Sequence, residues 1–183
     1  LGESHGWPAK GWAQGVFDIS LEPKPIAYLL KSIFQEDKPV VHIGIIDSDQ
    51  NTIWNDVQVG VQRMSDHWNR IEGSTMSLWT YTNADEVELY VNGKSYGVKK
   101  NEEGKSKNKL KWDGIKYAPG YVEAIARKDG KVVARHRIET TGKAKKLVVE
   151  SDNANWQADG FINLYGLPIK VQAQVDAAKA KKN

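Results

Sequence analysis

The feature that most constrains the fold is a strict alternation of polar and apolar side chains over residues 86–91. The apolar set is Val87, Leu89 and Val91. Because residues two apart in a strand share a face, this pattern predicts a strand with one buried face and with Glu86 and Glu88 in solvent. Asn92-Gly93 follows at once, and both residues accept the positive φ of a type I′ turn. The segment therefore predicts a β-hairpin.

Similar short runs recur from Trp68 to Thr141, and turn dipeptides such as Pro119-Gly120 and Asp129-Gly130 separate them. About seven strands at this spacing are typical of an immunoglobulin-like antiparallel β-sandwich. The sequence contains no Cys, which excludes the disulfide-bonded antibody variety, a thiolate nucleophile and a Cys-based zinc site. We therefore predict a mainly β fold, in which a loop and a short helix precede the sandwich.

An amphipathic stripe precedes the predicted sandwich. Its members, at i, i+3, i+4 and i+7, are Ile26, Leu29, Leu30 and Ile33. Pro23 and Pro25 stand at its start and Pro39 follows its end, which predicts a helix of about three turns. Such a helix is marginal alone in water, so its stripe is expected to cover the sandwich, the apolar run Val40–Ile46 or a second copy of the chain.

The segment after the sandwich predicts further strands, and the overall charge limits the classes of partner. The runs Leu147–Val149 and Ile169–Val175 predict strands of a further β domain, followed by a frayed end. The net charge is +3, and Lys179, Lys181 and Lys182 near the end account for it. The remainder is neutral, which argues against a nucleic-acid partner. No apolar run is long enough to cross a membrane, so no membrane insertion is expected.

Two sets of segments together resemble the carboxy-terminal part of bacterial family 2 glycoside hydrolases of the β-galactosidase type. The first set comprises Leu1-Gly2-Glu3, Gly15–Ile19, Pro23–Phe34 and Pro39–Ile43. The second comprises Thr80–Ser95, Tyr117–Gly120 and Lys128–Lys131. In that family the first set is similar to the loop after the last barrel strand, the last barrel helix and the exit from the barrel. The second set is similar to the sandwich that follows.

The resemblance implies a division of the chain and a role for it. The expected parts are 1–46 as the remnant of a catalytic (β/α)₈ barrel, 47–67 as a linker, 68–141 as the sandwich, and 142–183 as the start of a further β domain. Family members cleave β-glycosides with retention through two glutamates on barrel strands, which would lie upstream. We therefore expect a non-catalytic fragment that supports the barrel, with carbohydrate bound through the missing barrel and no cofactor. A periplasmic or extracellular location is expected for the parent.

Glu3, His5 and Trp7 are the candidate substrate-binding residues, because the resemblance places them in the remnant of an active-site loop. They would contact sugar only in the intact enzyme, and the alternative is that they are ordinary loop residues. No catalytic residue is expected in the chain itself. His42, His67 and His136 are too far apart in the sequence to predict a metal site, and we expect core or surface histidines.

Two other functions remain open from the residues alone. One is a carbohydrate-binding module with a platform of exposed tryptophans. The candidates are Trp54, Trp68, Trp79, Trp112 and Trp156. Core packing is favoured for those in strand runs. The other is an immunoglobulin-like protein-interaction domain. The helical stripe favours the hydrolase fragment, because a free-standing sandwich offers that helix no role.

Overall fold

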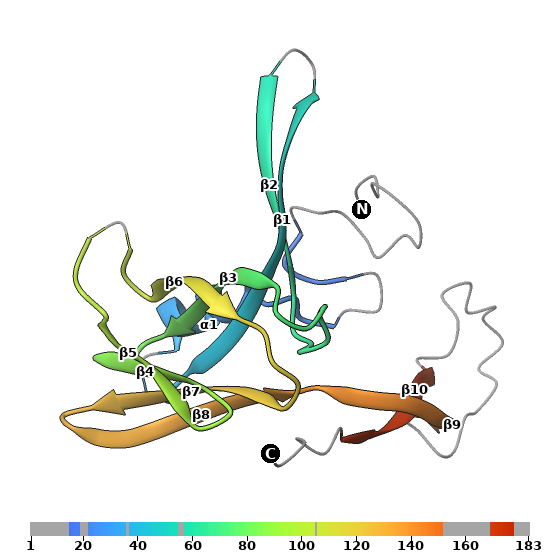
Figure 1. The fold of residues 1–183 in the computed structure, drawn as a ribbon. Helices are drawn as coiled ribbons and strands as arrows, with labels where there is room; N and C mark the ends of the chain where they lie inside the picture. The colour runs from blue at the N-terminus through green and yellow to red at the C-terminus, as the bar shows by residue number, and fades with distance from the viewer. Residues whose placement is uncertain are drawn as a thin grey trace, which may run out of the picture.

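The structure, a computed structural model, describes residues 15–18, 22–35, 37–54, 57–104, 106–151 and 169–177. These residues form a mainly antiparallel β protein with one short helix (Figure 1). Two four-stranded sheets make up the sandwich, and a separate pair of strands extends from it. In this part of the chain no helix is long and apolar enough to span a membrane.

The first sheet has the strand order β2-β1-β3-β6. Its strands are β1 (Val41–Trp54), β2 (Val57–Ser65), β3 (Thr75–Thr82) and β6 (Lys109–Lys116). Strand β1 pairs with β3 only over Val41–Ile45, and its remaining residues pair with β2 alone. The distal part of β1 and β2 therefore leaves the sandwich as a projecting hairpin, which Figure 1 shows standing clear of both sheets. We call residues 48–63 of this hairpin the arm.

The second sheet has the order β5-β4-β7-β8. Its strands are β4 (Glu86–Val91), β5 (Lys94–Lys100), β7 (Tyr121–Lys128) and β8 (Lys131–Glu139). Asn92 and Gly93 turn β4 into β5 with φ of 49° and 81°, as a type I′ turn requires. Asp129 and Gly130 do the same between β7 and β8, with φ of 50° and 73°. Both hairpins predicted from these dipeptides are confirmed.

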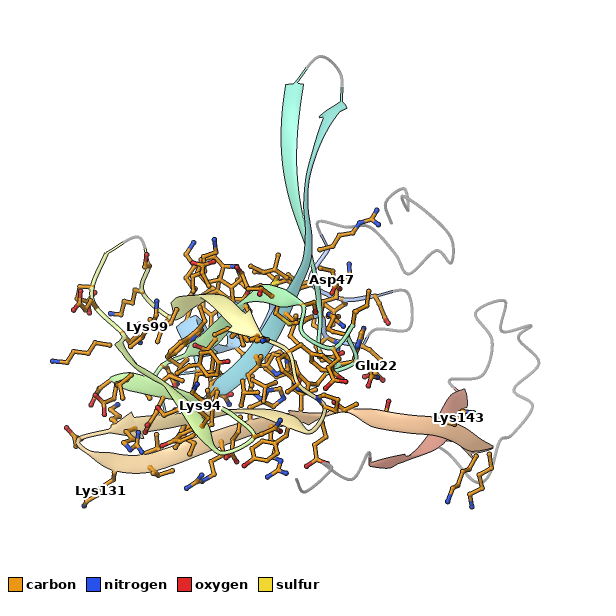
Figure 2. All side chains as sticks on the ribbon, viewed as in Figure 1. Glu22, Asp47, Lys94, Lys99, Lys131 and Lys143 are labelled. Carbon is orange, nitrogen blue, oxygen red and sulfur yellow. The ribbon has the colours of Figure 1, made fainter. Side chains whose placement is uncertain are left out.

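The core lies between the two sheets. The largest fully buried side chains include Trp68, Tyr81, Ile43, Ile45, Leu78, Leu89 and Val87. Strand β4 buries its three apolar residues and leaves Glu86 and Glu88 half-exposed, so the predicted face assignment is confirmed. Strand β5 at the sheet edge is almost wholly exposed, and Lys94 and Lys99 project from it (Figure 2). Lysines on an exposed edge disfavour pairing with strands of other molecules.

The apolar run at 41–46 lies in the sandwich, although the sequence placed it with the barrel remnant and placed 47–67 in a linker. Val40, Val41, His42 and Ile43 are buried in succession, which occurs when both faces of a strand are covered. Residues 57–65 form β2, so the segment between is a hairpin. An apolar run without alternation does not show which face of a sheet it covers. The sequence alone therefore did not assign this run to the sandwich.

The predicted helix is present as α1 (Ala27–Phe34), and it packs on β1 and β3. Its most buried residue is Ser32, whereas Leu30 is 39% exposed and Ile33 46% exposed. The two other stripe residues, Ile26 and Leu29, are half-buried. The helix therefore turns only part of its predicted stripe toward the sandwich.

The two strands predicted after the sandwich are also present. Strand β9 (Thr141–Ser151) follows β8 directly and pairs antiparallel with β10 (Ile169–Ala177). Figure 1 shows this pair extending beyond the end of the sandwich. Whether it begins a further domain, as the sequence predicts, stays a prediction.

Candidate functional site

The predicted substrate-binding residues Glu3, His5 and Trp7 lie outside the described residues, so their role stays a prediction. Within the described ranges, no group of three or more His, Cys, Asp or Glu side chains could hold a metal ion. Two other places concentrate polar groups. One is the contact between α1 and the sandwich, and the other is a groove at the base of the arm.

Asparagine side chains bind the chain at the end of α1. Asn83 Nδ2 donates to the carbonyl oxygens of Gln35 and Lys38 at 2.7 and 2.8 Å, and its Oδ1 accepts from Val40 N at 2.8 Å. The last carbonyls of a helix have no hydrogen-bond donor within the helix. Donors from outside the helix, such as an asparagine Nδ2, therefore satisfy them. Asn83 lies just after β3. The sandwich therefore ties down both the helix end and the connection to β1.

A second asparagine supports the same contact from the loop before β6. Asn108 Nδ2 donates to Ser32 O at 3.2 Å, and Asn108 Oδ1 accepts from Asn101 Nδ2 at 3.1 Å. Asn101 Oδ1 in turn accepts from Asn108 N at 2.7 Å. Asn108 has φ of 65° and is buried, a conformation that Asn tolerates better than most residues. We call Asn83, Asn101 and Asn108 the asparagine seam.

An aromatic column crosses the molecule beside this seam. Tyr28 of α1 stacks on His42 of β1 with ring centroids 3.6 Å apart, and His42 stacks on His136 of β8 at 4.2 Å. His136 Nδ1 accepts a hydrogen bond from Ile43 N at 3.0 Å. The column therefore joins the helix to both sheets, because its three rings come from α1, the first sheet and the second sheet.

Burial keeps the two histidines of the column neutral. Desolvation lowers the pKa of His42 to about 3, and the nearby His136 and Lys31 act in the same direction. Burial also lowers the pKa of His136, with Asp66 opposing the shift. His42 Nε2 is buried and finds no hydrogen-bond partner in the described part of the chain. Both histidines pack in the interior, as expected from the sequence. The sequence did not predict that their rings stack on each other.

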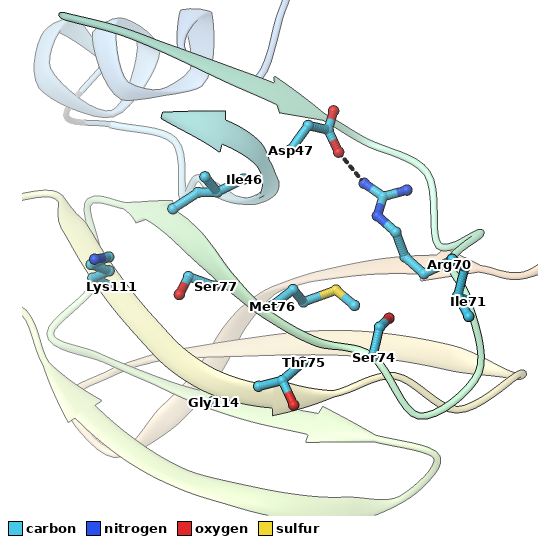
Figure 3. A pocket seen from close by; sticks show the side chains of 10 residues that line it. All are labelled: Ile46, Asp47, Arg70, Ile71, Ser74, Thr75, Met76, Ser77, Lys111 and Gly114. Carbon is cyan, nitrogen blue, oxygen red and sulfur yellow. Dashed lines mark hydrogen bonds and ion pairs between the residues drawn. The ribbon is translucent and has the colours of Figure 1, made fainter. Parts of the chain in front are cut away.

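The groove at the base of the arm has a volume of about 520 Å³ (Figure 3). It is lined by Ile46, Asp47, Arg70, Ile71, Ser74, Thr75, Met76, Ser77, Lys111 and Gly114. Arg70 pairs with Asp47 and donates to Ser65 Oγ at 2.7 Å. Figure 3 shows this ion pair beside the other lining side chains. No pattern in the sequence predicts this site, because its residues come from separate strands and loops.

The three candidate tryptophans whose side chains the structure describes do not form the platform that a carbohydrate-binding module would need. Trp68 and Trp112 are buried, and their Nε1 atoms donate to Ala118 O and Thr80 Oγ1. Trp79 is half-buried, with Lys109 Nζ 5.8 Å from its ring centroid. The Trp54 side chain and Trp156 lie outside the described set. Core packing is confirmed for Trp112 of β6 and for Trp68, which lies between β2 and β3.

The fold and these contacts define the class of protein: an immunoglobulin-like β-sandwich that carries a docked helix. Comparison with known proteins narrows this class to a family. A family model described as a domain of unknown function, DUF4982, matches residues 73–134, which lie within the sandwich.

Curated relatives and solved structures extend the match beyond that domain. The chain is 36% identical over 157 residues to "Beta-galactosidase BoGH2A" of Bacteroides ovatus, covering 85% of this chain and 16% of that protein. It is 29% identical over 164 residues to a "Putative beta-glucuronidase" of Formosa agariphila, covering 86% of this chain and 14% of that protein. A crystal structure of a glycosyl hydrolase family 2 member from Bacteroides cellulosilyticus superposes with a TM-score of 0.66 and 32% identity, over 80% of this chain and 19% of that one.

The chain belongs to glycoside hydrolase family 2, and it corresponds to a segment of such an enzyme that contains the sandwich. It spans only 16% and 14% of the two curated relatives. The family predicted from the sequence motifs is confirmed.

Proposed function

We propose that the chain is a non-catalytic segment of a retaining β-glycosidase, and that its sandwich holds α1 and the chain around it in place for a catalytic barrel. The observation that carries the proposal is the asparagine seam. Asn83 and Asn108 bind backbone carbonyls of α1 and of the residues that follow it. Backbone carbonyls move with the backbone that carries them, so these hydrogen bonds hold the orientation of the helix as well as its attachment.

The outer side of α1 supports the same role. Leu30 and Ile33 are 39% and 46% exposed, and Phe34 is 82% exposed. Burying apolar area stabilises by about 25 cal/mol per Å², so these side chains favour a covering surface. In the proposed parent that surface is the barrel, and the sandwich serves as the base on which the helix is mounted. A division into a barrel remnant that ends before β1, the sandwich and the start of a further β domain is part of this proposal.

Three of the described carboxyl groups, those of Glu88, Asp113 and Asp47, do not suit retaining hydrolysis. That reaction needs two carboxyl groups about 5 Å apart, one of them kept protonated by a raised pKa. Hydrogen bonds from Tyr90, Ser95 and Arg127 lower the pKa of Glu88. Ser77 and Lys111 lower the pKa of Asp113 in the same way. Asp47 is bound in its ion pair with Arg70. The lowered pKa values keep Glu88 and Asp113 ionised, which fits a supporting segment.

The parent reaction is proposed to be hydrolysis of O-glycosyl bonds. The relatives named above are called a β-galactosidase and a β-glucuronidase, so the chain's similarity leaves the sugar open between them. Glu3, His5 and Trp7 remain the proposed substrate contacts of this segment within the intact enzyme.

The test uses the full-length parent with the seam weakened by Asn83→Ala or Asn108→Gly. Asn69→Ala is the matched control, because Asn69 also makes two side-chain hydrogen bonds, to Thr141, but does not contact α1. We expect both seam variants to lower the temperature of thermal inactivation by several degrees more than the control does, with KM unchanged. Seam variants that inactivate at the same temperature as the wild type would contradict the proposed support.

A further inference from the structure

The arm ends in a strand edge that no other strand covers in the described part of the chain. Strand β2 lies at the end of its sheet and pairs there with β1 alone. Figure 1 shows the arm standing clear of both sheets of the sandwich. The backbone N–H and C=O groups on the far side of β2 therefore form a template on which another strand can pair.

The other strands at the ends of the two sheets carry charges that oppose such pairing. Each of β5, β6 and β8 contains three lysines or arginines. These residues are Lys94, Lys99 and Lys100 in β5, Lys109, Lys111 and Lys116 in β6, and Lys131, Arg135 and Arg137 in β8. Like charges on an edge strand repel a second copy of the same edge. Three of the four sheet ends are therefore protected against self-association.

Strand β2 lacks this protection within the arm. Residues 57–62 read Val-Gln-Val-Gly-Val-Gln, with no charged residue and no proline. Valine is among the residues that favour strands most. Short segments with high strand propensity, low charge and no proline are typical of strands that pair with copies of themselves. The composition of β2 thus favours strand pairing, whereas the compositions of β5, β6 and β8 oppose it.

The segment is also complementary to itself. Val57, Val59 and Val61 occupy alternate positions and so belong to one face of the ribbon. When two β2 strands pair antiparallel about a twofold axis perpendicular to the sheet, residues opposite each other share a face. Odd-numbered residues of one copy then stand opposite odd-numbered residues of the other. Within 57–62, valine meets valine and the polar positions meet one another.

We propose that two copies of the chain associate through antiparallel pairing of β2 with β2, which joins their arms into one four-stranded sheet. The contact is isologous, because each copy contributes the same edge. A two-stranded hairpin alone is marginally stable in water, and three or more strands are needed for independent stability. Pairing therefore stabilises both arms. The contact lies outside the sandwich and does not depend on the proposed barrel.

The occupant of the edge is a second copy of the chain and not an unrelated strand. An unrelated peptide would find the same backbone groups, but only a second copy supplies an uncharged partner with valine opposite valine at every register. The contact is small, since six residues of strand span about 20 Å. Stable complexes bury about 1,200 Å² or more in total. We therefore expect a weak dimer with a dissociation constant on the order of 100 µM.

Hydrogen exchange of the 183-residue chain, followed by mass spectrometry, tests the pairing. Every sample carries Ile33→Glu, which removes the association expected through the helical stripe. Amides of residues 57–62 should exchange about threefold more slowly at about 500 µM than at about 5 µM protein, because mass action populates the dimer. Residues 94–100 of β5 are the internal control, and their exchange should not depend on concentration.

Lysines placed in the arm separate self-pairing from folding. Gln58→Lys together with Gln62→Lys brings like charges of the two copies onto the same face of the joined sheet. This variant should lose the slowed exchange and raise the dissociation constant from sedimentation equilibrium at least about tenfold. Its urea midpoint should be unchanged, because the arm lies outside the core.

The matched control raises the net charge by the same two units in an exposed loop far along the chain. Glu102→Gln with Glu103→Gln removes two exposed acids, and the exposed pair of Glu103 with Lys107 contributes little to stability. This control should associate like its Ile33→Glu background. Exchange in 57–62 that is independent of concentration, slowing in 94–100 instead, or equal association of the lysine variant would each overturn the proposal. Protection of 57–62 in a longer parent at every concentration would assign the edge to another part of that parent, which would also overturn it.

Discussion

Replacing Asn108 tests the asparagine seam most sharply. The side chain makes two hydrogen bonds, to Ser32 O and from Asn101 Nδ2. Asn108→Gly removes both and keeps the left-handed backbone, because glycine adopts φ of 65° without strain. Each net hydrogen bond contributes about 1 kcal/mol, and a buried carbonyl left unpaired adds about 1 kcal/mol more. The expected loss in free energy of unfolding is therefore about 2–3 kcal/mol.

Asn108→Ala should cost about 1 kcal/mol more than Asn108→Gly, because a Cβ disfavours the left-handed region. Asp129 supplies the matched control, since it has φ of 50° in an exposed hairpin turn. Asp129→Gly should change the stability by less than about 0.5 kcal/mol, and Asp129→Ala should again cost about 1 kcal/mol more. The Ala and Gly variants should thus differ in stability by the same amount at both sites. Only at Asn108 should substitution by Gly itself lower the free energy of unfolding.

Urea unfolding followed by tryptophan fluorescence measures these differences, because Trp68 and Trp112 are buried in the core. The free energy of unfolding comes from the midpoint and the slope, which should be the same in all four variants. An Asn108→Gly variant within about 0.5 kcal/mol of the wild type would refute the reasoning. In that case the hydrogen bonds to α1 would contribute nothing to holding the helix.

Three further predictions concern the core, the histidine column and the helix. Leu89→Ala should cost about 2–5 kcal/mol by leaving a core cavity, whereas Glu86→Ala on the opposite face should cost less than about 0.5 kcal/mol; similar losses would show that the face assignment of β4 is wrong. Burial lowers the pKa of His42 from 6.5 to about 3, so the unfolded chain binds a proton that the native state does not. Stability should therefore fall as the pH drops from about 6.5 toward 3, by up to about 1.4 kcal/mol per pH unit from this group. The His42→Phe variant should lose part of that slope in urea titrations at several pH values, and an unchanged slope would remove His42 as its cause. Self-association of the isolated chain through Ile26, Leu29, Leu30 and Ile33 should appear in sedimentation velocity as a mass that rises with concentration. Ile33→Glu should suppress it, while Lys94→Glu should not.

Local pattern was enough to predict the hairpins and the faces of the strands. Asn92-Gly93 and Asp129-Gly130 specify type I′ turns through backbone preference alone. The alternation in β4 fixes its buried side, because a shift of one residue would expose the whole apolar set. The prolines at the start of α1 and the spacing of its stripe located the helix. Its eight residues make about two turns instead of the three expected. These features depend on residues that are close together in the sequence, so they can be predicted from it.

Contacts between distant segments could not be predicted in the same way. His42 and His136 meet because β1 lies against β8, a contact that no spacing in the sequence encodes. The helix buries Ser32 instead of its whole apolar stripe, and Asn108 of the seam binds the Ser32 carbonyl. The groove depends on two bulges, at Asp47 and at Asp113-Gly114. Glycine and acidic residues at these positions are equally typical of ordinary turns.

The central claim is that this segment supports catalysis without performing it, and a turnover assay tests it most directly. The purified 183-residue chain and a longer parent that includes the proposed barrel are incubated with nitrophenyl β-galactoside, β-glucoside and β-glucuronide. We expect hydrolysis of at least one substrate by the parent and none above buffer by the chain. Turnover by the chain that Glu3→Gln abolishes would make Glu3 catalytic, and turnover that survives this change would reveal another active site. Either result would contradict the account.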